Sequence, residues 1–90
     1  MKQRPIAENN DEMKWEEQDS KLTKKFEAKS FSDICEKLNQ LAPIANQMDH
    51  HPDFEVSGYK YIQFTLFTHS ENRITELDHR LAQKIDSIFR

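Results

Sequence analysis

Residues 59–69 read Tyr-Lys-Tyr-Ile-Gln-Phe-Thr-Leu-Phe-Thr-His and predict the strongest β-strand of this 90-residue chain. The segment is β-branched or aromatic nearly throughout, and its most apolar residues alternate, as in a strand with one buried face. Those alternating residues are Ile62, Phe64 and Leu66. The single glycine of the chain, Gly58, comes just before and predicts a turn or bulge that needs positive φ or a close approach. We therefore expect a short strand over 54–56 to pair back across this turn.

A second pair of alternating segments lies nearer the N-terminus, over 13–17 and 22–28. The sequence Gln-Asp-Ser at 18–20 separates them as a turn. One face of the second segment carries Leu22, Lys24, Phe26 and Ala28. The pattern predicts a hairpin, and its many charges require that one face contacts water.

Two further segments have the three- and four-residue spacing of an amphipathic helix. The first begins at Ser30, a good N-cap residue, with Asp33 placed to answer the cap. The second begins at Thr75, with Asp78 as its capping partner. The apolar stripes are Phe31, Ile34, Leu38, Leu41, Ala45 and Met48 in the first, and Ile74, Leu77, Leu81, Ile85 and Ile88 in the second.

Pro43 interrupts the first of these helices. Inside a helix, proline removes a hydrogen bond and clashes with the preceding turn, at a cost of about 3 kcal/mol. We expect a kink rather than a break, because the apolar stripe continues to Met48.

The order of elements is strand, strand, helix, strand, strand, helix. This order predicts an α+β fold (ββαββα): a four-stranded antiparallel sheet with two helices packed on one face. Residues 1–11 are polar and without a period, so we interpret them as a flexible leader and 12–90 as a single domain.

Composition limits the classes of function. With 13 Lys and Arg against 16 Asp and Glu, the formal charge is −3, which argues against a nucleic-acid partner. No apolar run approaches the roughly 20 residues that span a bilayer, and the N-terminus does not resemble a secretory signal. The single cysteine, Cys35, cannot form an intrachain disulfide and lies within the first helical stripe. The default interpretation is a cytoplasmic protein that binds neither nucleic acid nor membrane.

Three of the four histidines lie at the ends of predicted elements: His50 and His51 after the first helix, and His69 after the strong strand. One interpretation is purely structural, with histidines at a helix end and on an exposed strand. A zinc site is disfavoured because adjacent histidines cannot easily bind one ion. The third interpretation is acid–base chemistry without a metal, because imidazole titrates near neutral pH.

The spacing of these residues resembles the signature of the pterin-4a-carbinolamine dehydratase family. His50-His51-Pro52 is followed by six residues and Tyr59, nine and His69, then eight and Asp78. The resemblance covers about residues 13–90, with Trp15 and Phe26 as further landmarks, and this spaced set is far more specific than a lone histidine pair.

The resemblance implies dehydration of 4a-hydroxytetrahydropterin to quinonoid dihydropterin, a hydro-lyase reaction that recycles tetrahydropterin without metal or cofactor. It implies catalysis by His50, His51 and His69, with His50 and His69 as our choice for the two proton transfers. The residues implied to bind substrate are Asp49, Pro52, Phe54, Thr68, Ser70 and Asp78. It also implies a homodimer or homotetramer, and an aromatic amino acid hydroxylase in the same pathway.

Three residues depart from the family pattern. Asn46 replaces a residue that is usually charged, and an amide cannot raise imidazole basicity through charge. Asn72 and Arg73 replace a Gly-Gly pair, and arginine tolerates left-handed backbone poorly. These departures keep open an alternative: a weakly active or non-catalytic member that acts as a pterin-binding or protein-interaction module.

Overall fold

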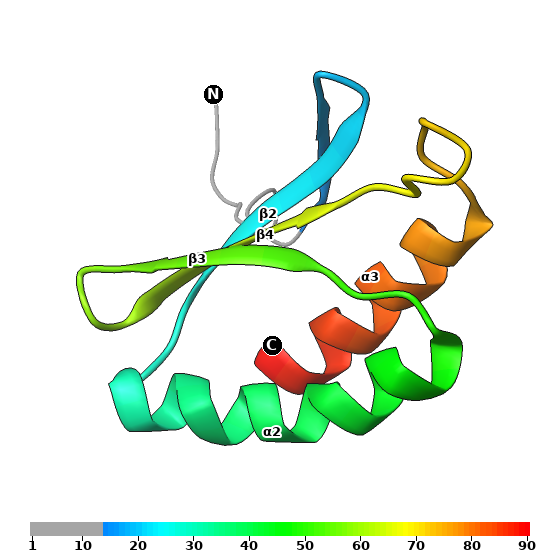
Figure 1. The fold of residues 1–90 in the computed structure, drawn as a ribbon. Helices are drawn as coiled ribbons and strands as arrows, with labels where there is room; N and C mark the ends of the chain where they lie inside the picture. Colours follow the sequence, from blue (N-terminus) through cyan, green and yellow to red (C-terminus); the bar gives the residue numbers. More distant parts are fainter. Residues whose placement is uncertain (1–13) are drawn as a thin grey trace.

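The computed structural model describes residues 14–90, so the expected leader and Met13 lie outside the described residues. Six elements follow one another in the expected order (Figure 1). They are β1 (Glu16–Gln18), β2 (Lys21–Glu27), α2 (Phe31–Met48), β3 (Asp53–Ser57), β4 (Tyr61–Leu66) and α3 (Glu76–Phe89).

The four strands form one antiparallel sheet in the order β1-β2-β4-β3. Both hairpins predicted from alternation are therefore present, and the central β2–β4 ladder joins them, with Lys24 opposite Phe64. Helices α2 and α3 lie on the same side of the sheet (Figure 1). The predicted α+β fold is confirmed.

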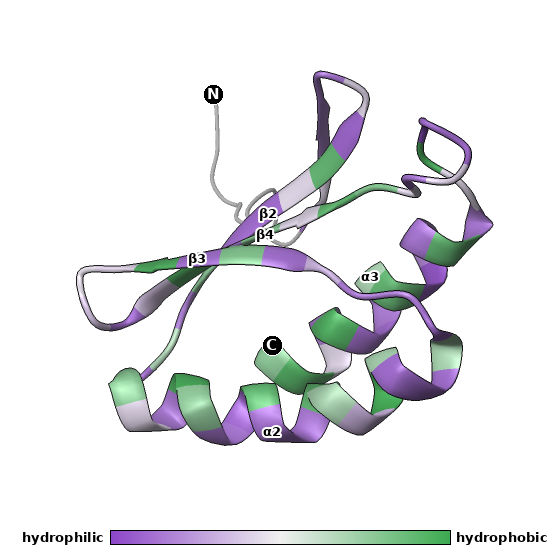
Figure 2. Ribbon diagram, in the orientation of Figure 1, coloured by the Kyte–Doolittle hydropathy of each residue, from purple (hydrophilic) through white to green (hydrophobic). Residues whose placement is uncertain are grey.

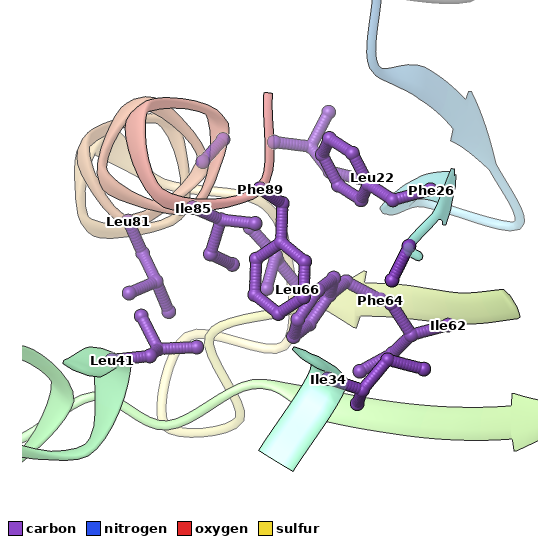
Figure 3. Packing of buried hydrophobic residues seen from close by; sticks show 12 residues of the cluster. Leu22, Phe26, Ile34, Leu41, Ile62, Phe64, Leu66, Leu81, Ile85 and Phe89 are labelled. Atoms are coloured by element: carbon purple, nitrogen blue, oxygen red, sulfur yellow. The ribbon is translucent and has the colours of Figure 1, made fainter. Parts of the chain in front are cut away.

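The core forms where the apolar face of β4 meets the two helices. Ile62, Phe64 and Leu66 are at most 1% exposed, as their alternation predicts. Figure 3 shows Phe64 among side chains from β2, α2 and α3, and its ring centroid lies 5.1 Å from that of Phe89. Figure 2 shows hydrophobic and hydrophilic residues interspersed along both helices, as in helices buried on one side only.

One member of the predicted helical stripes is exposed. Phe31 is 55% exposed, because it is the first residue of α2, where the chain has just left the sheet. In α3 the buried positions also include Ala82 and Phe89, which lie outside the predicted stripe, whereas Ile88 is partly buried against the core. Cys35 is exposed, so it does not belong to the buried stripe.

Helix α2 continues without a break through Pro43. The apolar residues on either side of the proline pack into the core and hold the two halves together, since Leu41 and Ala45 are both buried.

Within residues 14–90, no helix has the length and apolar character needed to cross a bilayer.

A partly buried ion pair joins the first hairpin to the last helix. Lys24 shares the apolar face of β2, and its Nζ lies 2.7 Å from Asp86 Oδ1 in α3. The same oxygen accepts a hydrogen bond from the indole Nε1 of Trp15 at 3.1 Å. Because an unpaired buried charge is costly, this pairing lets a lysine occupy a core-facing position.

Candidate functional site

The end of α2 projects the histidine pair away from the helix. Asp49 adopts the left-handed conformation (φ 53°), and its N–H donates to the carbonyls of Ala45 and Asn46. The N–H of His50 also bonds to the Ala45 carbonyl, at 3.1 Å. This left-handed cap stops the helix, and Pro52 disfavours helical backbone at the residue before it. The two histidines therefore lie in the short connection between the end of α2 and the start of β3 at Asp53.

The connection from β4 to α3 presents the third histidine. The N–H of Thr68 donates to the Arg73 carbonyl at 3.1 Å, and the N–H of Asn72 donates to the His69 carbonyl at 3.2 Å. Asn72 adopts positive φ (58°) and Arg73 does not, so the residue that tolerates this backbone occupies the demanding position. The substitution of the Gly-Gly pair is thus accommodated in a closed turn.

A cavity of about 580 Å³ lies where these two segments meet. Six of the residues singled out in the sequence line it: Asp49, His50, His51, Thr68, His69 and Ser70. All three candidate imidazoles therefore line one cavity, although His69 lies 18 positions after His51 in the sequence. Its volume lies in the usual range for sites that bind small molecules.

Asp78 does not line the cavity but contacts His50, which does. Its carboxylate is fully buried, and Oδ1 lies 2.6 Å from His50 Nε2. Oδ2 accepts hydrogen bonds from Thr68 Oγ1 at 2.7 Å and from the N–H of Thr75 at 2.9 Å. The side chain has no exposed surface, so the expected direct substrate contact does not fit its position. It instead links the α3 capping box to His50.

The charge of Asp78 sets the orientation of the His50 ring. Burial alone would raise the pKa of this carboxyl, but the hydrogen bonds from His50, Thr68 and Thr75 outweigh burial and hold the pKa below its ordinary value. An ionised carboxylate only accepts hydrogen bonds, so His50 Nε2 carries the proton of the shared bond. The other ring nitrogen, Nδ1, is then the one that can exchange protons with a ligand.

His51 has a different partner. Its Nε2 lies 2.9 Å from Oδ1 of Asn46, in the last turn of α2. The amide oxygen accepts a hydrogen bond from Nε2–H, so the proton lies on the same ring nitrogen as in His50. Unlike the carboxylate of Asp78, this amide carries no negative charge. Adjacent histidines therefore have a charged partner in one case and a neutral partner in the other.

Three apolar residues complete the cavity wall: Met48, Phe67 and Leu77. Met48 and Leu77 belong to the predicted helical stripes, and Phe67 belongs to the segment predicted as the strongest strand, so their sequence patterns predict no role in the site. The signal that could have identified Phe67 is its position two residues before His69, because alternate residues of an extended chain share a side.

Other predicted residues lie elsewhere. Pro52 and Phe54 line a separate apolar depression of about 210 Å³ beside α2, which His51 also borders. Phe54 is 49% exposed, and Tyr59 is 64% exposed at the turn between β3 and β4. Neither lines the histidine cavity. His79 is exposed on α3 and also lies outside it.

Two further observations bear on other kinds of site. A depression of about 340 Å³ lies beside β1 and β2, lined mainly by lysine, glutamate, glutamine and threonine side chains, and it contains no histidine. Among residues 14–90, no group of three or more His, Cys, Asp or Glu side chains is arranged to hold a metal ion. The residues suited to proton transfer gather in the 580 Å³ cavity.

Comparison with known proteins adds independent information. The sequence profile of the family described as pterin 4 alpha carbinolamine dehydratase matches residues 1–88. A protein of Sulfolobus acidocaldarius is 43% identical over 74 residues, covering 82% of this chain and 80% of that protein. A protein of Brucella ovis is 38% identical over 76 residues, covering 82% and 77%. Both carry the provisional name pterin-4-alpha-carbinolamine dehydratase.

Two solved structures share the fold. A transcriptional coactivator/pterin dehydratase from Brucella melitensis superposes with a TM-score of 0.80 at 33% identity, covering 97% of this chain and all of the other. A pterin dehydratase-like protein identified as a RuBisCO assembly factor in the alpha-carboxysome superposes with a TM-score of 0.68 at 25% identity, covering 82% and 87%. Sequence, fold and relatives agree: the chain belongs to the pterin-4a-carbinolamine dehydratase family.

Proposed function

We propose that this protein dehydrates 4a-hydroxytetrahydropterin to quinonoid dihydropterin by acid–base catalysis. The observation that carries the proposal is the convergence of His50, His51 and His69 on one cavity of about 580 Å³. Imidazole both accepts and donates protons near neutral pH, and the reaction requires one transfer in each direction.

The chemistry needs two proton transfers at neighbouring atoms of a flat bicyclic ring. The C4a–O bond breaks with its electron pair as the hydroxyl receives a proton and leaves as water. At the same time N5 loses its proton, and the electron pair of that N–H bond forms the N5=C4a double bond. A base and an acid held on either side of the ring supply both transfers.

His50 is suited to act as the base. Its Nε2 is bonded to the buried carboxylate of Asp78, which leaves Nδ1 for the N5 proton. The imidazolium formed by that transfer is then stabilised by the adjacent negative charge, as a buried carboxylate does for a histidine base in hydrolases. His69 is exposed, lines the cavity from the connection between β4 and α3, and is suited to protonate the leaving hydroxyl. His51 binds and assists, with the exposed Asp49 and Ser70 as polar groups for the pterin. The hydroxyl of Thr68 is already bonded to Asp78, so Thr68 contributes to the site by holding that carboxylate.

The test is the rate of dehydration measured by stopped flow or in a coupled hydroxylase assay. We expect His50→Ala and His69→Ala to lower kcat by about 100-fold or more, because each removes one proton transfer. His79→Ala is the matched control, since this histidine is exposed on α3 outside the cavity. Wild-type turnover that survives both substitutions would show that the catalytic assignment is wrong.

A second candidate function is a pterin-binding or protein-interaction module without significant turnover. It is favoured by Asn46, which gives His51 a neutral partner, and by the relative at 25% identity that is a RuBisCO assembly factor. Full dehydratase activity of the wild type at low enzyme concentration would dismiss this alternative. Pterin binding without turnover would support it.

We also propose that the protein acts as a homodimer or homotetramer in the cytoplasm, in a pathway with an aromatic amino acid hydroxylase. Strands β1 and β3 are the edges of the sheet and offer unpaired backbone groups, which proteins commonly cover by association. Phe31 and Phe54 are exposed by 55% and 49%, and burying them would also favour assembly. Light scattering after gel filtration tests the expected mass of two or four chains.

A further inference from the structure

We propose that Phe67 is a positioning residue that orients the imidazole of His69, and this inference rests on the proposed dehydration. The ring centroids of Phe67 and His69 lie 5.2 Å apart with an interplanar angle of 79°. An edge-to-face arrangement at this distance is a favourable geometry for two aromatic rings. Both residues line the cavity that contains His50 and His51.

The local backbone explains why the two rings meet. Phe67 directly follows Leu66, the last residue of β4, and His69 comes two positions later. Thr68 between them is only 4% exposed, with its hydroxyl bonded to Asp78. Because successive side chains of an extended chain point to opposite sides, the inward direction of Thr68 places Phe67 and His69 together on the other side.

His69 differs from the other two histidines in how it is held. His50 is hydrogen-bonded to Asp78, and His51 to Asn46. Among the side chains of residues 14–90, the exposed His69 ring contacts the ring of Phe67. A ring contact restricts the side-chain rotamer and occupies neither Nδ1 nor Nε2. Both nitrogens thus remain able to exchange protons, one with the leaving hydroxyl and the other with water.

Lys21 holds Phe67 from the neighbouring strand. Its Nζ lies 5.4 Å from the centroid of the Phe67 ring, within the range of a cation–π interaction. Lys21 precedes Leu22, whose partner in the β2–β4 ladder is Leu66, so the lysine lies beside the point where Phe67 leaves the sheet. The chain of contacts therefore runs from Lys21 through Phe67 to His69.

The test compares Phe67→Leu, which removes the ring, with Phe67→Tyr, which keeps it. We expect Phe67→Leu to lower kcat by about 10- to 100-fold with little change in KM, since a misplaced catalytic group slows the chemical step. Phe67→Tyr should retain most of the wild-type kcat. Phe31→Leu is the matched control, because it makes the same substitution at the far end of α2 from the histidine pair and outside the cavity. If Phe67→Leu does not fold, Phe67→Met takes its place.

Three kinetic outcomes would overturn the inference: an unchanged kcat in Phe67→Leu, equal losses in Phe67→Leu and Phe67→Tyr, or a rise in KM alone. The last would make Phe67 a substrate contact rather than a positioning residue. An NMR measurement provides the independent readout. We expect nuclear Overhauser contacts between the two rings, and ring-current shifts of the His69 carbon-bound protons, in the wild type and in Phe67→Tyr.

The NMR measurement also separates this inference from the proposed function. If the wild type does not dehydrate 4a-hydroxytetrahydropterin, the proposed function is wrong, and the ring contact alone then decides whether Phe67 orients His69. Absence of that contact in the wild type overturns the inference even when the enzyme is active.

Discussion

Asp78 Oδ1 lies 2.6 Å from His50 Nε2, so a carboxylate in the first turn of α3 holds an imidazole at the end of α2. The same aspartate is the capping partner of Thr75. The Asp78 side chain thus caps the N-terminus of α3 and orients a candidate catalytic base. The local stability of α3 and the geometry of the site are therefore physically coupled.

Asp78→Asn should impair both roles. The amide keeps the size of the side chain but adds a donor where Asp78 accepts three hydrogen bonds, so either a donor loses its acceptor or His50 must change tautomer and give up Nδ1 as its basic nitrogen. We expect kcat to fall about 10- to 100-fold and the free energy of unfolding to fall by about 1–3 kcal/mol. Dehydration kinetics and urea denaturation measure the two effects. Asp53→Asn, at an exposed position of β3, is the control, and an equal loss of activity there would refute the assignment.

The stability difference between the wild type and Asp78→Asn should depend on pH. Hydrogen bonds hold the pKa of Asp78 below its ordinary value of about 3.9 despite burial. A carboxyl with a lower pKa in the folded state stabilises the fold above its unfolded pKa, and this contribution is lost as pH falls through the folded pKa. The difference in free energy of unfolding should therefore be largest at neutral pH and shrink from about pH 5 downward. Urea midpoints measured from pH 7 to pH 3 test this, and a constant difference would contradict it.

Asn46→Asp should change the pH dependence of the reaction. A carboxylate at this position would stabilise the charged form of His51, which the present amide does not do. If the neutral form of His51 is the one needed for catalysis, the acidic limb of the plot of kcat against pH should move to higher pH. Asn39→Asp, an exposed change on the same helix, should leave the profile unchanged. A profile that is the same in both variants would show that the Asn46–His51 bond does not affect catalysis.

Lys24→Met should lower stability without changing the chemistry. The substitution leaves the carboxylate of Asp86, with 20% of its side chain exposed, without its ammonium partner. We expect the free energy of unfolding to fall by about 3 kcal/mol, whereas the exposed neighbour Lys25→Met should change it by less than about 0.5 kcal/mol. The kcat of folded Lys24→Met should equal that of the wild type, because neither Lys24 nor Asp86 lines the histidine cavity. A large fall in kcat would connect the ion pair to the site.

The features that were predictable from sequence are those set by local patterns. Alternation around Phe64 identified the central strand, and the caps at Ser30 and Thr75 identified both helix starts. Gly58 adopts positive φ (55°), as its position before the strand indicated. Each of these signals depends on residues within one turn or one strand, which is why a single sequence was enough.

The features that escaped prediction depend on contacts across the fold. The bond between His50 and Asp78 joins residues 28 apart, and only the packing of α2 against α3 brings them together. Alternation places Phe67 on the face of its strand opposite Leu66, but it does not show that this face borders the histidine pair, because residues from the end of α2 and the start of α3 form the rest of the cavity wall. Phe54 follows the histidine pair closely in sequence, yet β3 directs it to a different depression.

The most direct test of the account is a crystal structure of the wild-type protein with 7,8-dihydrobiopterin, a stable analogue of the substrate ring. We predict that the bicyclic ring lies among His50, His51 and His69, with its N5 edge toward Nδ1 of His50. A ring bound instead against Phe54 and Pro52, or in the polar depression beside β1 and β2, would contradict the central claim that the three imidazoles form the reaction site.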